Sequence, residues 1–231
     1  MKDAISGIKK ALLGARPTLN IAAKKNYLLL REALSRDGAR PRILCVGAGM
    51  VPGEGIDALG PDIVRTDIEY SGNLDIACDG GMLSFKEGSF DAVILQAVLE
   101  HAKNYRDIIK ESRRVLKDGG YVYAEMPFIQ GRHTENDYRR FTLEGLKSEM
   151  RGIGGFTEIK AGICCGPFSG FVWTTSALLA LIFSFNNRWL FERLNILFLY
   201  LLLPLKYLDI FFGRSKNAEM IASAFYFIGR K

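Results

Sequence analysis

Residues that could hold a structural metal are scarce in this sequence. Its 231 residues include two histidines and four cysteines, and no C-x-x-C pair is present among Cys45, Cys78, Cys164 and Cys165. Structural zinc sites need closely spaced Cys and His ligands, so we expect no metal site. Cys45 and Cys78 fall in apolar, strand-like runs, which is typical of core residues. We therefore expect reduced cysteines in a cytosolic environment.

A secretory signal pattern is also missing from the start of the chain. The short apolar stretch in MKDAISGIKKALLGARP is interrupted by Lys9 and Lys10, whereas a signal peptide needs an unbroken apolar core. We therefore expect the main domain to stay in the cytoplasm.

The net positive charge is confined to residues 1–40, called the leader here. Residues 1–40 hold nine Lys or Arg against three acidic residues, which accounts for the whole formal net charge of +6. A basic leader with helically spaced apolar residues favours an anionic membrane surface as partner, and ordinary solvated helices are the alternative. We do not expect nucleic acid, because the leader has no aromatic residue other than Tyr27 and the rest of the chain carries no net positive charge.

Strand-like and helix-like segments alternate after residue 41. We expect leading helices at 1–16 and 19–36, strands at 42–46, 62–67, 74–77, 90–95 and 120–126, and helices at about 53–59 and 104–117. A polar loop over 129–141, a helix over 142–150 with Thr142 as N-cap, and strands near 156–162 and 222–231 follow. This alternation predicts an α/β fold, with a parallel sheet covered by helices on both faces.

The first strand of this set has the layout of a nucleoside site. The strand RILCV runs into Gly47-Ala48-Gly49, and Asp67 follows the next strand. Glycines let backbone N–H groups approach a ligand, and an acid about 20 residues further on accepts hydrogen bonds from ribose hydroxyls. Glu69 is the alternative ribose partner. Gln96, at the end of the strand 90–95, is expected to point into the cleft at the carboxyl edge of the sheet.

Further motifs follow in a fixed order. They are Cys78-Asp79, Ser89-Phe90-Asp91, Val98-Leu99-Glu100-His101, Arg114-Val115-Leu116-Lys117-Asp118-Gly119-Gly120 and Asp137-Tyr138-Arg139-Arg140-Phe141-Thr142. With Asp67, this set resembles the class I S-adenosylmethionine-dependent methyltransferases, and within them the bacterial type 11 branch that is often associated with glycan biosynthesis. The resemblance covers about 42–160 and the last strand.

The resemblance implies a Rossmann-like methyltransferase sheet and S-adenosylmethionine as cofactor. Gly47 and Gly49 would line its methionine and ribose part. Asp79 would receive the adenine amino group, and Gly80 and Met82 would surround the ring. Asp79 could instead form only an Asx turn. Gln96 would lie near the reacting sulfonium.

The loop IQGRHTENDYRRFT is the candidate for the substrate side, because it follows strand 120–126 at the same sheet edge. Methyl transfer to a hydroxyl is an in-line displacement helped by a base. We expect His133 as this base and Asp137 as the residue that orients it or binds a sugar hydroxyl. The residues Tyr138, Arg139 and Arg140 are expected to bind substrate. The alternative is an Asp137–Arg140 ion pair that closes the loop.

An apolar insertion separates the last two strands. Residues 161–187 carry no charge, and the second apolar run, 194–212, is interrupted by Pro204, Lys206 and Asp209. We expect in-plane or re-entrant membrane association at the inner face of the cell membrane; two spans, or a soluble dimerisation or lid element, are the alternatives. The predicted domains are 1–40, a methyltransferase domain of 41–165 with 217–231, and a membrane-associated insertion of 166–216.

These features predict a methyltransferase that acts on a hydroxyl of a glycan or lipid-linked precursor at the membrane, in polysaccharide biosynthesis. A non-catalytic membrane-bound scaffold is one alternative. An NAD-dependent nucleotide-sugar oxidoreductase is another, on the pattern G-x-G-x-x-A at 53–58. Those glycines come too late after the strand, and the chain has no Y-x-x-x-K pair.

Overall fold

The computed structural model describes residues 17–35, 40–49, 56–69 and 74–231. The expected helix at 1–16 and the glycines at 53 and 55 lie outside these ranges. The chain divides into two compact units. The first, called the sheet unit here, comprises 22–128, 132–164 and 224–231. The second, the helical unit, comprises 17–21, 129–131 and 165–223 within the described ranges.

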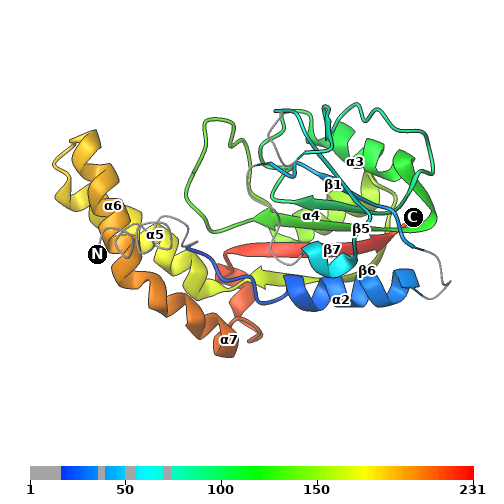
Figure 1. Ribbon diagram of the computed structural model, residues 1–231. Helices are drawn as coiled ribbons and strands as arrows, with labels where there is room; N and C mark the ends of the chain where they lie inside the picture. The colour runs from blue at the N-terminus through cyan, green and yellow to red at the C-terminus, as the bar shows by residue number, and fades with distance from the viewer. Residues whose placement is uncertain (1–16, 36–39, 50–55, 70–73) are drawn as a thin grey trace, which may run out of the picture. The chain divides into compact units, whose positions relative to one another are not determined.

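The sheet unit is built on a seven-stranded sheet in the order β3-β2-β1-β4-β5-β7-β6 (Figure 1). Its strands are β1 (Ile43–Val46), β2 (Ile63–Asp67), β3 (Ile76–Ala77), β4 (Phe90–Gln96), β5 (Leu116–Pro127), β6 (Thr157–Cys165) and β7 (Ala224–Arg230). Strands β1 to β5 pair in parallel, and β7 pairs antiparallel with β5. The predicted α/β, Rossmann-like fold is confirmed.

Helices cover both faces of this sheet. Helix α2 (Ala23–Leu34) lies on one face, and α3 (Tyr105–Val115) and α4 (Leu143–Gly152) lie on the other (Figure 1). The described part of the helix expected at 53–59 is the short 3-10 helix η2 (Ile56–Leu59). Thr142 is the N-cap of α4, as predicted, and its side chain accepts a hydrogen bond from the backbone N–H of Gly145 at 3.1 Å.

The core lies under the two central strands. Every residue of β1 is buried, and so are most of β4, because a parallel sheet covered on both faces needs near-continuous apolar strands. Tyr27 of α2 packs on Tyr123 of β5 with ring centroids 5.0 Å apart. Burial raises the pKa of the Cys45 thiol to about 12, so this cysteine is a core residue, as expected.

The helical unit consists of α5 (Pro167–Phe183), α6 (Arg188–Leu202), η3 (Leu203–Leu208), α7 (Asp209–Phe212) and η4 (Ala218–Ile221). The residues 188–212 form one 25-residue helical stretch that contains an 18-residue window with a mean hydropathy of 1.7, so it is long and apolar enough to cross a membrane. Pro204 does not end this stretch, because it sits in the first turn of η3, where its missing N–H is tolerated.

Candidate active site

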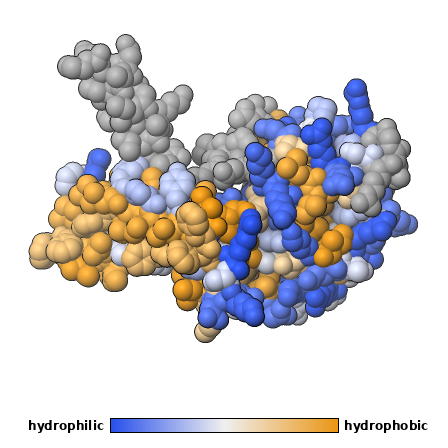
Figure 2. Space-filling model, turned by 90° about the horizontal axis from the view of Figure 1, so that it is seen from below, coloured by the Kyte–Doolittle hydropathy of each residue, from blue (hydrophilic) through white to orange (hydrophobic). Residues whose placement is uncertain are grey.

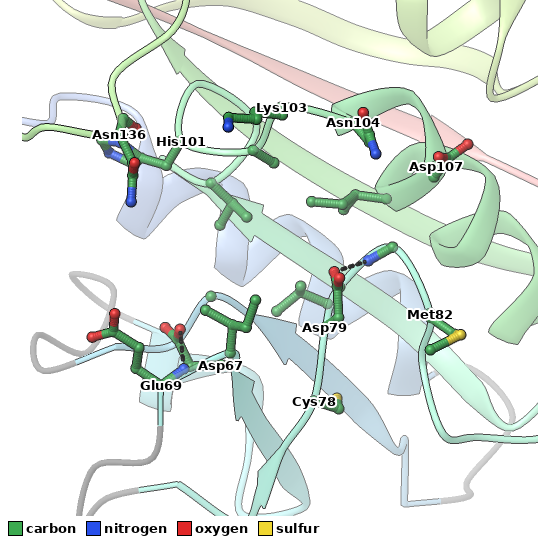
Figure 3. A pocket seen from close by; sticks show the side chains of 18 of the residues that line it. Asp67, Glu69, Cys78, Asp79, Met82, His101, Lys103, Asn104, Asp107 and Asn136 are labelled. Carbon is green, nitrogen blue, oxygen red and sulfur yellow. Dashed lines mark hydrogen bonds between the residues drawn. The ribbon is translucent and has the colours of Figure 1, made fainter.

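A cavity of about 980 Å³ opens in the sheet unit at the carboxyl ends of β1, β2 and β4. Strands β1 and β4 are neighbours although β2 and β3 lie between them in sequence, so the strand order reverses beside this cavity. Open parallel sheets bind ligands at such a reversal. In Figure 3, Asp67 and Glu69 lie at one end of the cavity, Asp79 and Met82 at another, and His101 and Asn136 across from Asp67.

The turn after β1 requires glycine. Gly47 has φ +67°, a left-handed conformation, and a Cβ atom there would lie 2.5 Å from Cγ2 of Val98. Both residues line the cavity. A larger side chain would therefore strain the backbone and displace a wall of the cavity.

Asp67, the last residue of β2, is held beside this turn. Its Oδ2 accepts a hydrogen bond from the backbone N–H of Gly49 at 2.8 Å, and its Oδ1 accepts one from Glu69 at 3.3 Å. Asp67 and Glu69 both line the cavity. The structure therefore brings the predicted ribose acid and the glycine turn together, and it leaves Glu69 as the alternative partner.

Asp79 stands at the opposite end of the cavity in a tight turn. Its Oδ1 accepts from the N–H of Gly81 at 2.8 Å, and its carbonyl accepts from Met82 at 3.0 Å. The Asx turn therefore forms, and it leaves Oδ2 for a ligand. Gly80 lets this turn pack closely against Val46 of β1, because a Cβ at residue 80 would lie 2.9 Å from Cγ1 of Val46. Cys78 also lines the cavity, so its assignment to the core was wrong.

Gln96 does not line the cavity, contrary to the prediction. Its Oε1 accepts from the hydroxyl of Tyr27 at 3.2 Å, and its Nε2 donates to Oε2 of Glu125 at 2.7 Å. Side chains alternate across a strand, and Gln96 faces α2. The residues that follow it, Ala97 and Val98, line the cavity instead.

His133 and Asp137 lie close together but outside the cavity lining. The buried carboxylate of Asp137 accepts from the backbone N–H of His133 at 3.1 Å and from Nη2 of Arg140 at 2.8 Å. Oδ2 of Asp137 is also 3.2 Å from Nδ1 of His133. The Arg140 guanidinium lowers the pKa of Asp137 to about 2. The structure therefore contains the Asp137–Arg140 ion pair that was the alternative to a substrate role for these residues.

Arg139 and Tyr138 have different surroundings. The guanidinium of Arg139 donates to the carbonyls of Leu99 at 2.9 Å and Lys103 at 3.1 Å, and also to that of Ala102. It also lies 4.2 Å from the ring centroid of Tyr105. Arg139 therefore holds the 99–103 turn, and the prediction that it contacts substrate is not supported. Tyr138 does line the cavity and is 42% exposed.

His101 lines the cavity, although the sequence analysis did not select it as a site residue. Its Nδ1 lies 2.8 Å from the carbonyl oxygen of Asn136. A carbonyl can only accept, so in the neutral ring this contact places the proton on Nδ1 and the lone pair on Nε2. The His133 ring stands edge-on to the His101 ring, with centroids 5.0 Å apart.

Glu100 is the residue before His101 in the chain. Its carboxyl group is buried, and Oε2 has no hydrogen-bond partner among the described residues. Oε1 lies 3.8 Å from Nε2 of His101. Burial raises the pKa of Glu100 to about 8. Within the described ranges, no group of three or more His, Cys, Asp or Glu side chains could hold a metal ion.

Comparison with known proteins agrees with this geometry. Residues 54–124 match a family model described as "Methyltransferase domain", a span of less than a third of the chain. One curated relative, the polyketide synthase-nonribosomal peptide synthetase pyiS of Pyricularia grisea, is 40% identical over 70 residues, which are 30% of this chain. The match spans only 2% of that much longer protein.

Solved structures share the fold at low sequence identity. Phosphoethanolamine N-methyltransferase 2 of Haemonchus contortus is 17% identical, with a TM-score of 0.55, over 90% of this chain and 53% of that one. The 1,6-didemethyltoxoflavin-N1-methyltransferase of Burkholderia thailandensis is 14% identical, with a TM-score of 0.51, over 90% and 79%. The [4+2]-cyclase SpnF is 18% identical, with a TM-score of 0.53, over 91% and 81%.

The family match and the fold define the class of protein. The sheet unit has the class I methyltransferase fold, and its match to a methyltransferase domain supports the predicted S-adenosylmethionine-dependent enzyme. The cyclase with the same fold shows that architecture alone does not fix the reaction. The residues of the cavity must therefore carry the functional argument.

Proposed function

We propose that this chain is an S-adenosylmethionine-dependent methyltransferase whose methyl donor binds in the cavity between the Gly47 turn and Asp79. The observation that carries this proposal is the fixed carboxylate of Asp67, held 2.8 Å from the N–H of Gly49 at the cavity wall. Two ribose hydroxyls can donate to such a carboxylate. The structures of the Haemonchus contortus and Burkholderia thailandensis enzymes hold S-adenosylhomocysteine, which supports the choice of cofactor.

The remaining cavity residues suit the other parts of an adenosyl group. Oδ2 of Asp79 is available to accept from the adenine amino group, since its Oδ1 is used by Gly81. Met82 and Ile108, both in the cavity lining, offer apolar contact to the ring. Gly47, which has no side chain, leaves room in the cavity for the methionine part of S-adenosylmethionine. When bound, S-adenosylmethionine supplies an electrophilic methyl group on sulfur.

For the base we propose His101 rather than His133. His101 lines the cavity, and its Nδ1 contact with Asn136 directs the Nε2 lone pair to accept a proton. As the acceptor oxygen forms its bond to the methyl carbon and the carbon–sulfur bond breaks, the hydroxyl proton passes to His101. His133 and Asp137 then act as positioning residues, because the His133 ring packs edge-on against His101.

For the acceptor we propose a hydroxyl of a glycan or lipid-linked precursor at the inner face of the cell membrane. The resemblance to the type 11 branch supports a glycan. The apolar helical unit supports a lipid-linked one, because 188–212 has the length and hydropathy of a membrane segment. Tyr138, Lys103 and Asn136 add polar groups to the cavity lining that can bind sugar hydroxyls.

The proposal is tested by comparing lipid-linked sugars from cells with and without the gene by mass spectrometry. It predicts a species that is heavier by one methyl group in the cells with the gene. Purified protein incubated with an extract of the deletion cells and the methyl donor should release S-adenosylhomocysteine. Binding of the donor without release in any extract would favour the non-catalytic scaffold instead.

A further inference from the structure

Helix α6 is apolar on nearly all sides and contacts α5, where the ring centroids of Phe198 and Phe183 lie 6.0 Å apart, yet it stays largely exposed. None of its 15 residues is buried. Its charged residues, Arg188, Glu192 and Arg193, all lie in the first two turns. A helix that is apolar all round is normally found either in a protein core or in a membrane. The helical unit does not enclose α6 in a core.

Lys206 and Asp209, the charged residues that interrupt the second apolar run in the sequence, are buried within the helical unit. Asp209 is 0% exposed and caps the N-terminus of α5, accepting from the backbone N–H groups of Phe168 at 2.8 Å and Ser169 at 2.9 Å. It also accepts from the hydroxyl of Ser169 at 2.6 Å. Lys206 is only 8% exposed. The outer surface of the helical unit therefore lacks the charges that the sequence suggests.

Large apolar side chains cover that outer surface instead (Figure 2). Those exposed on α5, α6 and α7 are Phe171, Leu178, Leu181, Ile182, Phe183, Trp189, Ile196, Leu197, Leu201, Ile210, Phe211 and Phe212. Soluble monomers rarely expose a continuous apolar patch of this kind.

Polar and aromatic residues gather where α5 and α6 meet. Phe185, Asn186 and Asn187 form the connection, and Arg188 and Trp189 begin α6. Trp is enriched at membrane–water interfaces, and an Arg near a helix end extends its side chain to the interface. Helix α5 has 17 residues, which rise about 25 Å at 1.5 Å per residue. This length is close to the roughly 30 Å thickness of the hydrocarbon core.

We infer that α5 and α6 insert into a lipid bilayer as a helical hairpin, with residues 184–189 at its tip. A second copy of the chain would cover one side of the pair, whereas exposed large apolar side chains extend over α5, α6 and α7. A helix lying in the membrane surface would need a polar face along its length, and the charges of α6 are limited to its first two turns. The inference deepens the membrane part of the proposed function and requires no methyl transfer.

Fluorescence quenching in lipid vesicles tests the inference. The full chain is bound to phosphatidylethanolamine–phosphatidylglycerol vesicles that carry bromine either near the headgroups or near the ends of the acyl chains. Trp173→Phe leaves Trp189 at the tip as the single tryptophan. Leu178→Trp in a chain that also carries Trp173→Phe and Trp189→Phe places the reporter in the middle of α5. Tyr121→Trp in the same double-Phe background, on β5 of the sheet unit, is the matched control for adsorption.

A hairpin predicts a gradient of depth. Position 178 should be quenched most strongly by the deep bromines, position 189 by the shallow ones, and position 121 by neither. Equal, shallow quenching at 178 and 189 would overturn insertion in favour of an in-plane arrangement. Absence of quenching together with a dimer in solution would show that a second copy covers the surface. Thermal stabilisation by adenosylhomocysteine, measured on the same variants, reports the sheet unit separately, so failure of insertion is distinguishable from failure of cofactor binding.

Discussion

The backbone N–H of Gly49 donates to Oδ2 of Asp67 at 2.8 Å, which joins the turn after β1 to the last residue of β2. The two residues are 18 positions apart in the sequence. Their bond fixes the carboxylate at the cavity wall before any ligand arrives. Such preorganisation lowers the entropic cost of binding, because the Asp67 carboxylate does not have to be ordered when the ligand binds.

Gly47→Ala should weaken binding of S-adenosylmethionine by about tenfold or more. The left-handed backbone at φ +67° costs about 1–3 kcal/mol for a residue with a Cβ, and that Cβ would lie 2.5 Å from Val98. Equilibrium dialysis with labelled donor measures the change. Gly152→Ala is the control, because a Cβ at Gly152 meets no atom within 4 Å. Equal affinity in both variants would contradict the role of the turn.

His101→Ala should lower kcat by about 10²–10⁴-fold and leave donor affinity nearly unchanged, because a general base acts only in the chemical step. His133→Ala should lower kcat less, since His133 acts through its edge-on contact with His101. Initial rates with the acceptor, and donor affinity by dialysis, separate the two effects. A larger loss of kcat in His133→Ala would restore His133 as the base.

Glu100→Gln should flatten the dependence of stability on pH. Burial raises the pKa of Glu100 to about 8, while an unfolded glutamate titrates near ~4.3. Between these values the folded state holds a proton that the unfolded state has lost, so a rise in pH lowers the free energy of unfolding. The groups that influence Glu100 are Arg140, Asp137, Glu125 and His101.

The pH experiment compares thermal midpoints at pH 5 and pH 8. The wild type should lose stability on the order of a few kcal/mol across this range, and Glu100→Gln should lose less. Glu87→Gln, which removes an exposed carboxylate, should follow the wild type. An identical decline in all three proteins would rule out Glu100 as the source.

Cys78 should be the thiol that reports occupancy of the cavity. It lines the cavity and is half-buried, whereas Cys45, Cys164 and Cys165 are buried. N-ethylmaleimide should therefore modify Cys78 first, and adenosylhomocysteine should slow that reaction severalfold. Mass spectrometry of peptides locates the label, and Cys78→Ser should remove the fast phase. Modification that proceeds at the same rate with and without the ligand would contradict a shared site.

The fold and the cofactor side of the cavity were predictable because their signals are local. A buried strand followed by glycines, and an acid ending the next strand, fix Gly47, Gly49 and Asp67 at one sheet edge. Thr142 as a helix cap follows from the same kind of short-range rule. Each of these depends on residues close in sequence or on the regular geometry of a parallel sheet.

The remaining errors arose where a distant partner decides the direction of a side chain. Gln96 turns away from the cavity because Glu125, 29 residues later, accepts its hydrogen bond. The guanidinium of Arg139 donates its hydrogen bonds to backbone carbonyl groups 36 to 40 residues earlier in the chain. Asp209 interrupts an apolar run in the sequence, yet in the structure it caps a helix that begins about 40 residues before it. No local pattern contains these partners.

The central claim is that the cavity binds the adenosyl group through Asp67, and isothermal titration calorimetry with S-adenosylhomocysteine tests it most directly. The wild type should bind with a single site, and Asp67→Ala should bind at least tenfold more weakly, since one lost charged hydrogen bond is worth about 1.5–3 kcal/mol. Asp57→Ala, which removes an 85% exposed carboxylate on η2, should bind like the wild type. Binding that is undetectable in the wild type, or unchanged in Asp67→Ala, would contradict the account.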